Sequence, residues 1–218
     1  MQIAIGLYEG FTALDAIGPY AVFTQMPDTT VVLCADRTGR VSDDTGLLRL
    51  DIEHTFAEVP NPDVVLVPGG LITRRLAAEG GPIVDWLRTI HPTTTYTTSV
   101  CTGALLLGAA GVLDGRQATT HWLAAEHLRT HGAEPSAQRV VFDGKVVTGA
   151  GVSAGIDLAL TLVGELQGPE IAQAIQLGIE YDPQPPYDAG APQKAPPAIR
   201  DAVTEAMANA EAKLFAGT

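Results

Sequence analysis

Hydrophobic residues along this chain gather in short runs that alternate with longer segments of helical periodicity. Four runs are rich in β-branched residues and largely apolar, which predicts strands at residues 3–8, 30–35, 64–67 and 95–100. Strands without alternating polar positions are normally covered on both faces, as in a parallel sheet between two layers of helices. The pattern therefore predicts a doubly wound α/β fold with a mostly parallel sheet flanked by helices.

Helical periodicity predicts six helices in the body of the chain and one near its end. The body helices are expected at residues 12–26, 82–90, 102–113, 121–130, 153–166 and 169–182, and the last at 198–215. Two turn sequences, DDTG at residues 43–46 and DG at 143–144, separate short β-rich segments. Asp/Gly turns of this kind predict hairpins over residues 41–52 and 139–148.

A proline-rich arm follows residue 182 and separates two parts of the chain. Its prolines exclude regular structure and favour a stiff, extended path. We expect residues 1–182 to form one domain and residues 183–218 to form the arm and a C-terminal helix. A helix on such an arm exposes its apolar face unless that face docks on another surface. A homodimer with exchanged tails is one solution.

Composition narrows the class of protein. Of the 218 residues, 46% are hydrophobic and 17% charged, which is enough apolar material for a large core. The net charge of -12 disfavours a nucleic acid partner. The longest apolar stretch, residues 104–113, falls short of the roughly 20 that span a bilayer, and no basic segment precedes the first apolar run. Two cysteines make no disulfide framework, so we expect the reducing cytoplasm and no membrane association.

The strongest candidate for chemistry is Cys101, which lies where a predicted strand ends and a predicted helix begins. Ser99 and Gly103 leave room for the sharp turn that presents a nucleophile. The helix N-terminus behind the turn should stabilise a thiolate. Most cysteines are simply buried apolar residues, and Cys34, within a strand, fits that alternative better. We therefore expect Cys101 to be the nucleophile.

Three further segments are predicted to meet Cys101. Gly69 and Gly70 follow the third strand, and their N–H groups could form an oxyanion site with the N–H of Thr102. Asp15 lies in an apolar segment after the first strand. In one interpretation Asp15 satisfies backbone N–H groups at a helix start. In the other it reaches the Cys101 sulfur, and its apolar setting raises its pKa and keeps a proton available.

His121 opens the helix after the one that follows Cys101. It either approaches the same sheet edge and helps to bind substrate, or caps its own helix. His127 and His131 follow at roughly helical spacing, whereas His54 and His91 lie near predicted loops. No histidine pair has metal-ligand spacing with a supporting carboxylate, so no metal is predicted.

Together, the Cys101 turn, the acid after strand one, the PGG loop and the ATTHW segment at residues 118–122 resemble the ThiJ/PfpI superfamily, which has the flavodoxin-like, glutamine amidotransferase-like fold. The resemblance covers about residues 3–182. The segments LDAIGP (14–19), SVCTG (99–103) and GIEYDPQPPY (178–187) look most like the isocyanide hydratase group. That resemblance implies a dimeric, cofactor-free enzyme that hydrates an isocyanide to an N-substituted formamide. It assigns Cys101 as nucleophile, Asp15 as the acid and Thr102 as an assisting residue.

Other functions stay open. A glutaminase of this fold needs a His with a Glu two residues later, and none of the five histidines has one. Glyoxalase-like or deglycase-like relatives usually carry Glu where Asp15 stands, which disfavours that alternative. The same domain senses ligands in AraC-type regulators, but these continue into a basic helix-turn-helix domain, so we do not expect DNA binding here. A stand-alone ligand or redox sensor is the non-enzymatic alternative.

Overall fold

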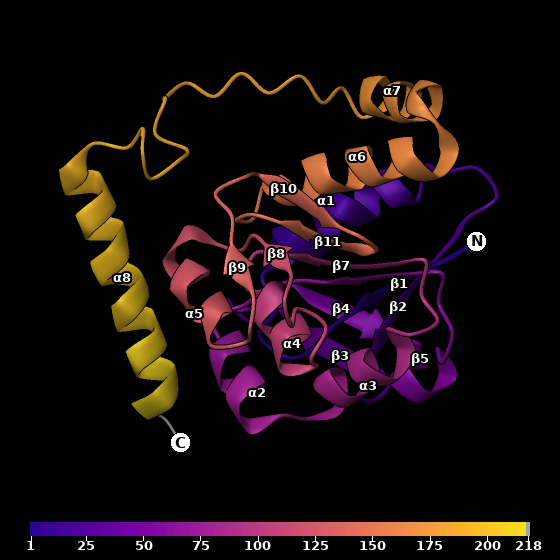
Figure 1. Cartoon of the computed structure of the whole chain (residues 1–218), viewed down its shortest axis with the longest axis horizontal. Coiled ribbons are helices and arrows are strands. Elements are labelled where there is room, and N and C mark those ends of the chain that lie inside the picture. The colour runs from indigo at the N-terminus through magenta and orange to yellow at the C-terminus, as the bar shows by residue number, and fades with distance from the viewer. Residues whose placement is uncertain (217–218) are drawn as a thin grey trace. The chain divides into compact units, whose positions relative to one another are not determined.

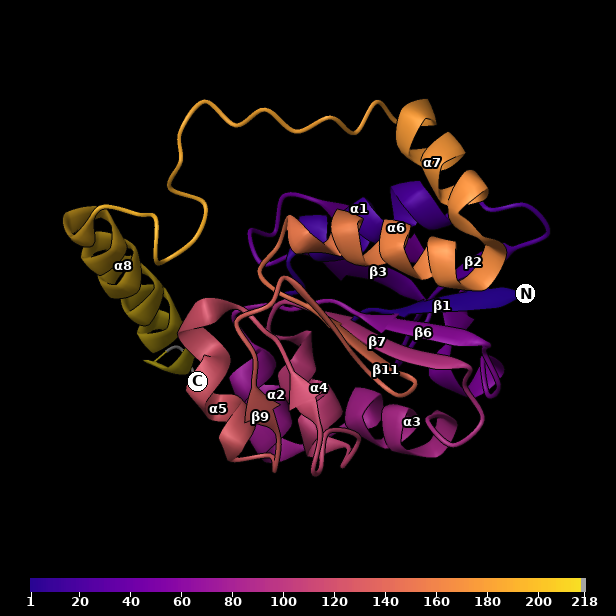
Figure 2. The ribbon, with the colours of Figure 1, turned by 45° about the horizontal axis from the view of Figure 1, so that its top comes forward.

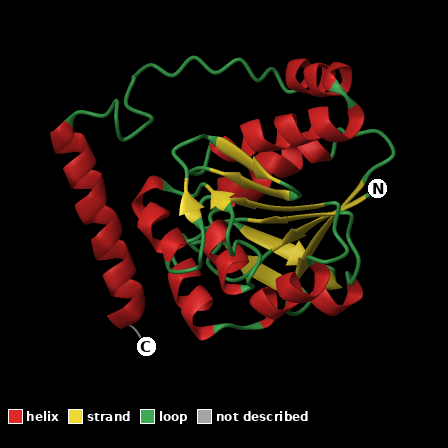
Figure 3. Cartoon of the chain, viewed as in Figure 1, coloured by secondary structure: helices red, strands yellow, loops and turns green. Residues whose placement is uncertain are grey.

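The computed structural model of the chain describes residues 1–216 and places a central sheet between two layers of helices (Figures 1 and 3). Within that part of the chain the sheet has seven strands in the order β10-β11-β7-β6-β1-β2-β5, and its pairs are parallel except β10 with β11. The strands are β1 (Gln2–Gly6), β2 (Thr30–Ala35), β5 (His54–Thr55), β6 (Val64–Val67), β7 (Tyr96–Val100), β10 (Val140–Asp143) and β11 (Val146–Gly149). The predicted fold class is confirmed.

The helices cover both faces of the sheet, as the uninterrupted apolar strands require (Figure 2). One layer consists of α1 (Ala13–Phe23), α6 (Ala154–Gln167) and α7 (Pro169–Gly178). The other consists of α2 (Thr73–Glu79), α3 (Pro82–Ile90), α4 (Gly103–Ala109) and α5 (Ala125–Arg129). Every residue of β6 and β11 is buried, because the strands lie between these layers. The core therefore sits on both sides of the central strands.

Several predicted helices are shorter in the structure. The one expected at 102–113 ends at Ala109, and Gly111 follows with a left-handed φ of 80°. The one expected at 169–182 ends at Gly178, two residues before Glu180 with a φ of 52°. The region 121–130 is split into a short 3-10 turn, η2 (Trp122–Ala124), and α5. Left-handed residues such as Gly111 and Glu180 cannot continue an α-helix, which explains the first two differences.

Both predicted hairpins are present. The first pairs β3 (Gly39–Ser42) with β4 (Arg49–Ile52) outside the main sheet, and the second is β10 with β11. In the turn after β3, the Asp43 carboxylate accepts the N–H groups of Leu47 at 3.1 Å and Leu48 at 3.2 Å. Sequence periodicity missed the elements that are too short to show a pattern. These are β5, α2, the 3-10 turn η1 (Phe56–Glu58) and the parallel pair β8 (Gln117–Ala118) and β9 (Glu134–Pro135).

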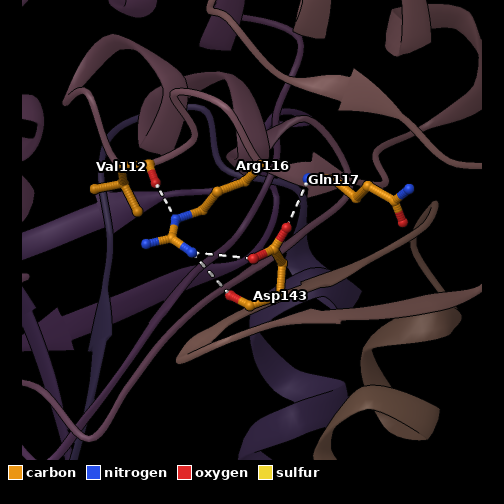
Figure 4. Close-up of polar contacts among 4 residues, drawn as sticks. All are labelled: Val112, Arg116, Gln117 and Asp143. Carbon is orange, nitrogen blue, oxygen red and sulfur yellow. Dashed lines mark hydrogen bonds and ion pairs between the residues drawn. The ribbon is translucent and has the colours of Figure 1, made fainter.

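An ion pair ties the turn of the second hairpin to the segment that follows α4 (Figure 4). Arg116 donates from Nη1 to Asp143 Oδ1 at 3.0 Å and from Nε to the carbonyl of Val112 at 3.2 Å. The second carboxylate oxygen of Asp143 accepts the N–H of Gln117 at 2.9 Å. Both charged side chains are about one-third exposed, so the pair is partly shielded from water. Asp143 thereby fixes β10 and β11 to the start of β8.

The chain divides into two compact units, Met1–Ile179 and Glu180–Thr218. The first holds the sheet and both helix layers. The second contains the proline-rich arm and α8 (Pro197–Ala216), which corresponds to the helix predicted at 198–215. Its apolar side chains Ile199 and Val203 are 54% and 42% exposed and lie one helical turn apart. No helix within residues 1–216 is long and apolar enough to cross a membrane.

Candidate active site

Cys101 occupies a sharp turn between β7 and α4, as the sequence predicts. Its φ is 56°, a left-handed conformation that residues other than glycine rarely adopt and that commonly marks functional sites. The surrounding backbone holds it there: its N–H donates to Gly149 O at 3.1 Å and Ala150 O at 2.9 Å. On the other side, Thr120 Oγ1 donates to its carbonyl at 2.8 Å. The residue is 6% exposed, so Cys101 is almost completely buried.

Glycine is needed both in the Cys101 turn and in the loop after β6, because the two backbones pack closely against each other. A Cβ at Gly103 would collide with the carbonyl of Val67 and lie 2.7 Å from that of Pro68. A Cβ at Gly69 would lie 2.7 Å from both Asp15 Oδ2 and Thr102 Oγ1. The close packing of these backbones brings the acid and the thiol together.

Asp15 lies in the first turn of α1 and is fully buried. Its Oδ2 accepts the N–H of Gly69 at 2.8 Å, and Oδ1 is buried without a hydrogen bond. Burial raises the pKa of Asp15 to about 7, and the charge of Asp44 adds to the increase, while the Gly69 amide and the Cys101 thiol oppose it. The carboxyl therefore holds a proton in a substantial fraction of molecules at neutral pH.

The pKa of Cys101 is raised, whereas the sequence led us to expect a lowered pKa and a stabilised thiolate. Burial, followed by the charge of Asp15, raises the pKa of Cys101 to about 12. The N–H groups of Val152 and Thr102 and the Thr102 hydroxyl oppose this, but α4 spans only seven residues and its N-terminus does not outweigh burial. The prediction of a low pKa from the turn alone is wrong. The two groups therefore act on each other unequally: the charge of Asp15 raises the pKa of Cys101, whereas the hydrogen bond with Cys101 lowers the pKa of Asp15.

The expected oxyanion site at Gly69 and Gly70 is not formed, because both N–H groups already have partners. Gly69 donates to Asp15, and Gly70 donates to Thr102 Oγ1 at 3.0 Å. The Thr102 hydroxyl in turn donates to the carbonyl of Gly70 at 3.1 Å. The loop after β6 therefore positions the acid and the Cys101 turn. Thr102 fastens that loop, and its own N–H interacts with the sulfur.

His121 caps η2: its Nδ1 accepts the N–H of Leu123 at 3.4 Å. Burial, followed by the charge of Arg74, lowers the pKa of His121 and favours the neutral ring. The ring lies so close to Gly151 that a Cβ there would be 2.7 Å from Cδ2. The helix-capping alternative is thus present, and a role in substrate binding stays a prediction. Within residues 1–216 no group of three or more His, Cys, Asp or Glu side chains is arranged to hold a metal ion.

Two residues of the site were missed in the sequence. Val152 precedes α6 with a φ of 31°, and its N–H interacts with the Cys101 sulfur. Tyr8 is buried after β1 and donates from its hydroxyl to the carbonyl of Pro68 at 2.7 Å. The GAGVS segment at residues 149–153 was a usable signal, because a glycine-rich turn from a strand into a helix exposes N–H groups. Val152 contributes through its backbone N–H, so the type of its side chain does not indicate a role in the site.

These residues come from four loops at the carboxyl ends of β1, β6, β7 and β11, where open α/β sheets place their ligands. Residues 1–165 match the DJ-1/PfpI family. The chain belongs to the DJ-1/PfpI family. It is 45% identical over 201 residues to the isonitrile hydratase of Pseudomonas putida, covering 92% of this chain and 87% of that protein.

Two further relatives of this DJ-1/PfpI protein are informative. A solved structure of a ThiJ/PfpI family protein from Pseudomonas syringae is 37% identical and superimposes with a TM-score of 0.92, covering 97% of this chain and 88% of the other. The HTH-type transcriptional regulator CdhR of Pseudomonas aeruginosa is 35% identical over 112 residues, 50% of this chain but 33% of the regulator. The hydratase thus matches almost the whole chain, and the regulator matches half of it.

Proposed function

We propose that this protein is a cysteine-dependent, cofactor-free isocyanide hydratase. The observation that carries the proposal is the buried pair of Asp15 and Cys101, an acid with a pKa raised to about 7 beside a nucleophile. The 45% identity to an isonitrile hydratase over nearly the whole chain supports the same reaction. An acid that keeps its proton at neutral pH suits a substrate whose carbon must be protonated.

In the first half of the proposed reaction, the Cys101 sulfur attacks the terminal carbon of the isocyanide. Asp15 gives its proton to the same carbon, which yields a thioimidate with a C–S bond and a formyl C–H bond. The N–H groups of Val152 and Thr102 partly offset the effect of burial on the pKa of Cys101, and so they favour the small thiolate population that attacks. Asp15 is left as a carboxylate in a buried setting, which makes it a ready base for the next step.

In the second half, water adds to the thioimidate carbon. The Asp15 carboxylate takes a proton from the water and passes it to the substrate nitrogen, which forms a tetrahedral adduct with one hydroxyl. The C–S bond then breaks, the sulfur leaves as a thiolate, and the hydroxyl proton returns to Asp15. The product is the N-substituted formamide, and the enzyme regains the protonated acid and the thiolate. The sum is one isocyanide and one water to one formamide.

Formamide production from a panel of aryl and alkyl isocyanides tests the proposal, with methylglyoxal consumption measured in parallel. We expect isocyanide turnover by the wild type and none by Cys101→Ala. Cys34→Ala is the matched control, because Cys34 is a buried thiol in β2 that is not part of the site, and it should retain turnover. Methylglyoxal turnover alone would indicate a glyoxalase-like enzyme, and activity on neither substrate would favour a ligand or redox sensor.

We also propose that the protein is a cytoplasmic homodimer in which residues 183–218 contribute to the interface. The exposed Ile199 and Val203 on α8 support an apolar contact, and a second copy of the chain is the proposed partner. The two cysteines are free thiols, which suits a reducing compartment. His121 is proposed to border the substrate site through its contact with Gly151.

A further inference from the structure

The β3–β4 hairpin is fastened to the loop between β1 and α1, the loop that leads into Asp15. The N–H of Gly10 donates to the carbonyl of Ser42 at 2.9 Å, and the N–H of Asp44 donates to that of Phe11 at 2.9 Å. The Glu9 carboxylate accepts the N–H of Ser42 at 3.2 Å. These contacts hold the hairpin turn at a fixed position beside the loop.

The side chain of Asp44 is held by the same loop. Thr12 Oγ1 donates to Asp44 Oδ2 at 2.8 Å, and the carbonyl of Thr12 accepts the N–H of Asp15 at 3.1 Å. The N–H of Thr12 donates to the carbonyl of Gly69 at 2.7 Å, and Gly69 in turn donates to the Asp15 carboxyl. Thr12 therefore connects the Asp44 carboxylate to the residues that position the acid.

Three titratable groups interact with Asp15, each from a different element. Cys101 comes from the turn after β7, Tyr8 from the loop after β1 and Asp44 from the turn of the hairpin. Burial and neighbouring charges raise the pKa of Tyr8 well above its usual value, so its hydroxyl is neutral. Burial, followed by the charge of Asp15, raises the pKa of Cys101 to about 12, so its thiol is neutral as well. Among these three described groups, Asp44 therefore supplies the fixed negative charge, and a like charge disfavours ionisation of Asp15.

We propose that Asp44 is a positioning residue for proton transfer: held against Thr12 by the hairpin, its carboxylate adds to the effect of burial in favouring the protonated form of Asp15. The catalytic consequence rests on the proposed function, whereas the effect on Asp15 is measurable without substrate. Asp44 itself touches neither the thiol nor the reacting carbon in this account. It acts only through the charge that it places near the acid.

Carbon-13 NMR of protein labelled at the aspartate carboxyls tests this proposal directly. The Asp15 resonance is identified by its loss in Asp15→Asn and then followed with pH in the wild type and in Asp44→Asn. The amide of Asn still accepts the Thr12 hydrogen bond but carries no charge. We expect the Asp15 midpoint to fall by a few tenths of a pH unit, a modest shift because Asp44 is exposed to solvent.

Asp51→Asn is the matched control, because Asp51 lies on the same hairpin and pairs with Arg40 at 3.3 Å with both side chains exposed. It should leave the Asp15 midpoint unchanged. Added salt should lower the midpoint in the wild type and have a smaller effect in Asp44→Asn, since it screens the same charge. The alkaline limb of kcat/KM for an aryl isocyanide should move down with the NMR midpoint.

An Asp15 midpoint that is equal in the wild type and in folded Asp44→Asn overturns the proposal. If Asp44→Asn does not fold by circular dichroism, the wild-type salt series decides, and a midpoint that is independent of salt overturns it. A shifted midpoint in a protein that turns over no isocyanide would contradict the proposed function alone. The role of Asp44 in holding the Asp15 proton would then stand.

Discussion

At the residue scale, the buried carboxyl of Asp15 links stability to pH. Its pKa is about 7 in the folded protein and about 3.9 in an unfolded chain, so the folded state binds the proton more tightly. The stabilisation is complete below the unfolded pKa and is lost as pH rises through 7. For this group alone, about 2–3 kcal/mol of the free energy of unfolding should disappear between pH 5 and 8.

Asp15→Asn tests this coupling, because asparagine still accepts the Gly69 N–H and does not titrate. Urea unfolding at pH 5 and pH 8 should show a smaller loss of stability in the variant than in the wild type. The difference between the two proteins is the quantity to compare, since other groups titrate equally in both. An identical pH dependence would mean that the Asp15 carboxyl is not buried as described.

Reactivity toward alkylating agents should separate the two thiols. Burial raises the pKa of both Cys34 and Cys101 to about 12, but Cys34 is fully buried, whereas Cys101 is 6% exposed and lies beside the Asp15 carboxyl. Iodoacetamide, read by peptide mass, should therefore modify Cys101 first. Asp15→Asn should change the pH dependence of that labelling. Equal rates for the two cysteines would contradict the arrangement of the pair.

The sequence correctly predicted that Cys101 and Asp15 lie together, but it did not predict the burial and hydrogen bonds around them. Cys101 and Asp15 do meet, because strand order places their loops at one edge of the sheet. The pKa of Cys101 and the use of the Gly69 and Gly70 amides depend on burial and on hydrogen bonds between loops, which no local pattern contains. Val152 contributes a backbone N–H, so its residue type gave no warning.

At the element scale, the hydrogen-bonded ion pair between Arg116 and Asp143 should stabilise the β10–β11 hairpin. Asp143→Ala removes the partner of the Arg116 guanidinium and of the Gln117 N–H. We expect a loss of about 1–3 kcal/mol in the free energy of unfolding, because partly shielded polar groups lose their hydrogen bonds. Turnover by the folded variant should be retained, since the site lies at the other end of β11.

The control for this prediction is Asp51→Ala, which breaks the exposed pair with Arg40 on the β3–β4 hairpin. Exposed pairs contribute roughly 0–1 kcal/mol, so that variant should unfold close to the wild type. Equal effects of the two substitutions in urea would show that partial burial adds nothing to the Arg116 pair. Both hairpins were predictable because each has an Asp/Gly turn between β-rich segments, whereas α2 spans seven residues, too few for clear periodicity.

At the scale of the whole molecule, the proposed homodimer should depend on the tail. Light scattering on the full chain and on a chain truncated after Asp182 compares the two states. We expect a dimer for the first and a weaker or absent dimer for the second, because truncation removes the apolar face with Ile199 and Val203. A monomeric full chain would contradict the dimer, and a truncated chain that dimerises equally well would exclude the tail as its cause.

The fold brings four loops to one sheet edge, where the buried carboxyl of Asp15 holds a proton beside the buried thiol of Cys101. That Asp15 gives this proton to the substrate carbon is the central claim. The most direct measurement is formamide production from an aryl isocyanide by Asp15→Asn and by the wild type at pH 7. The account predicts that turnover falls by about 10² or more, because asparagine keeps the shape and lacks the proton. Turnover by folded Asp15→Asn at the wild-type rate would contradict it.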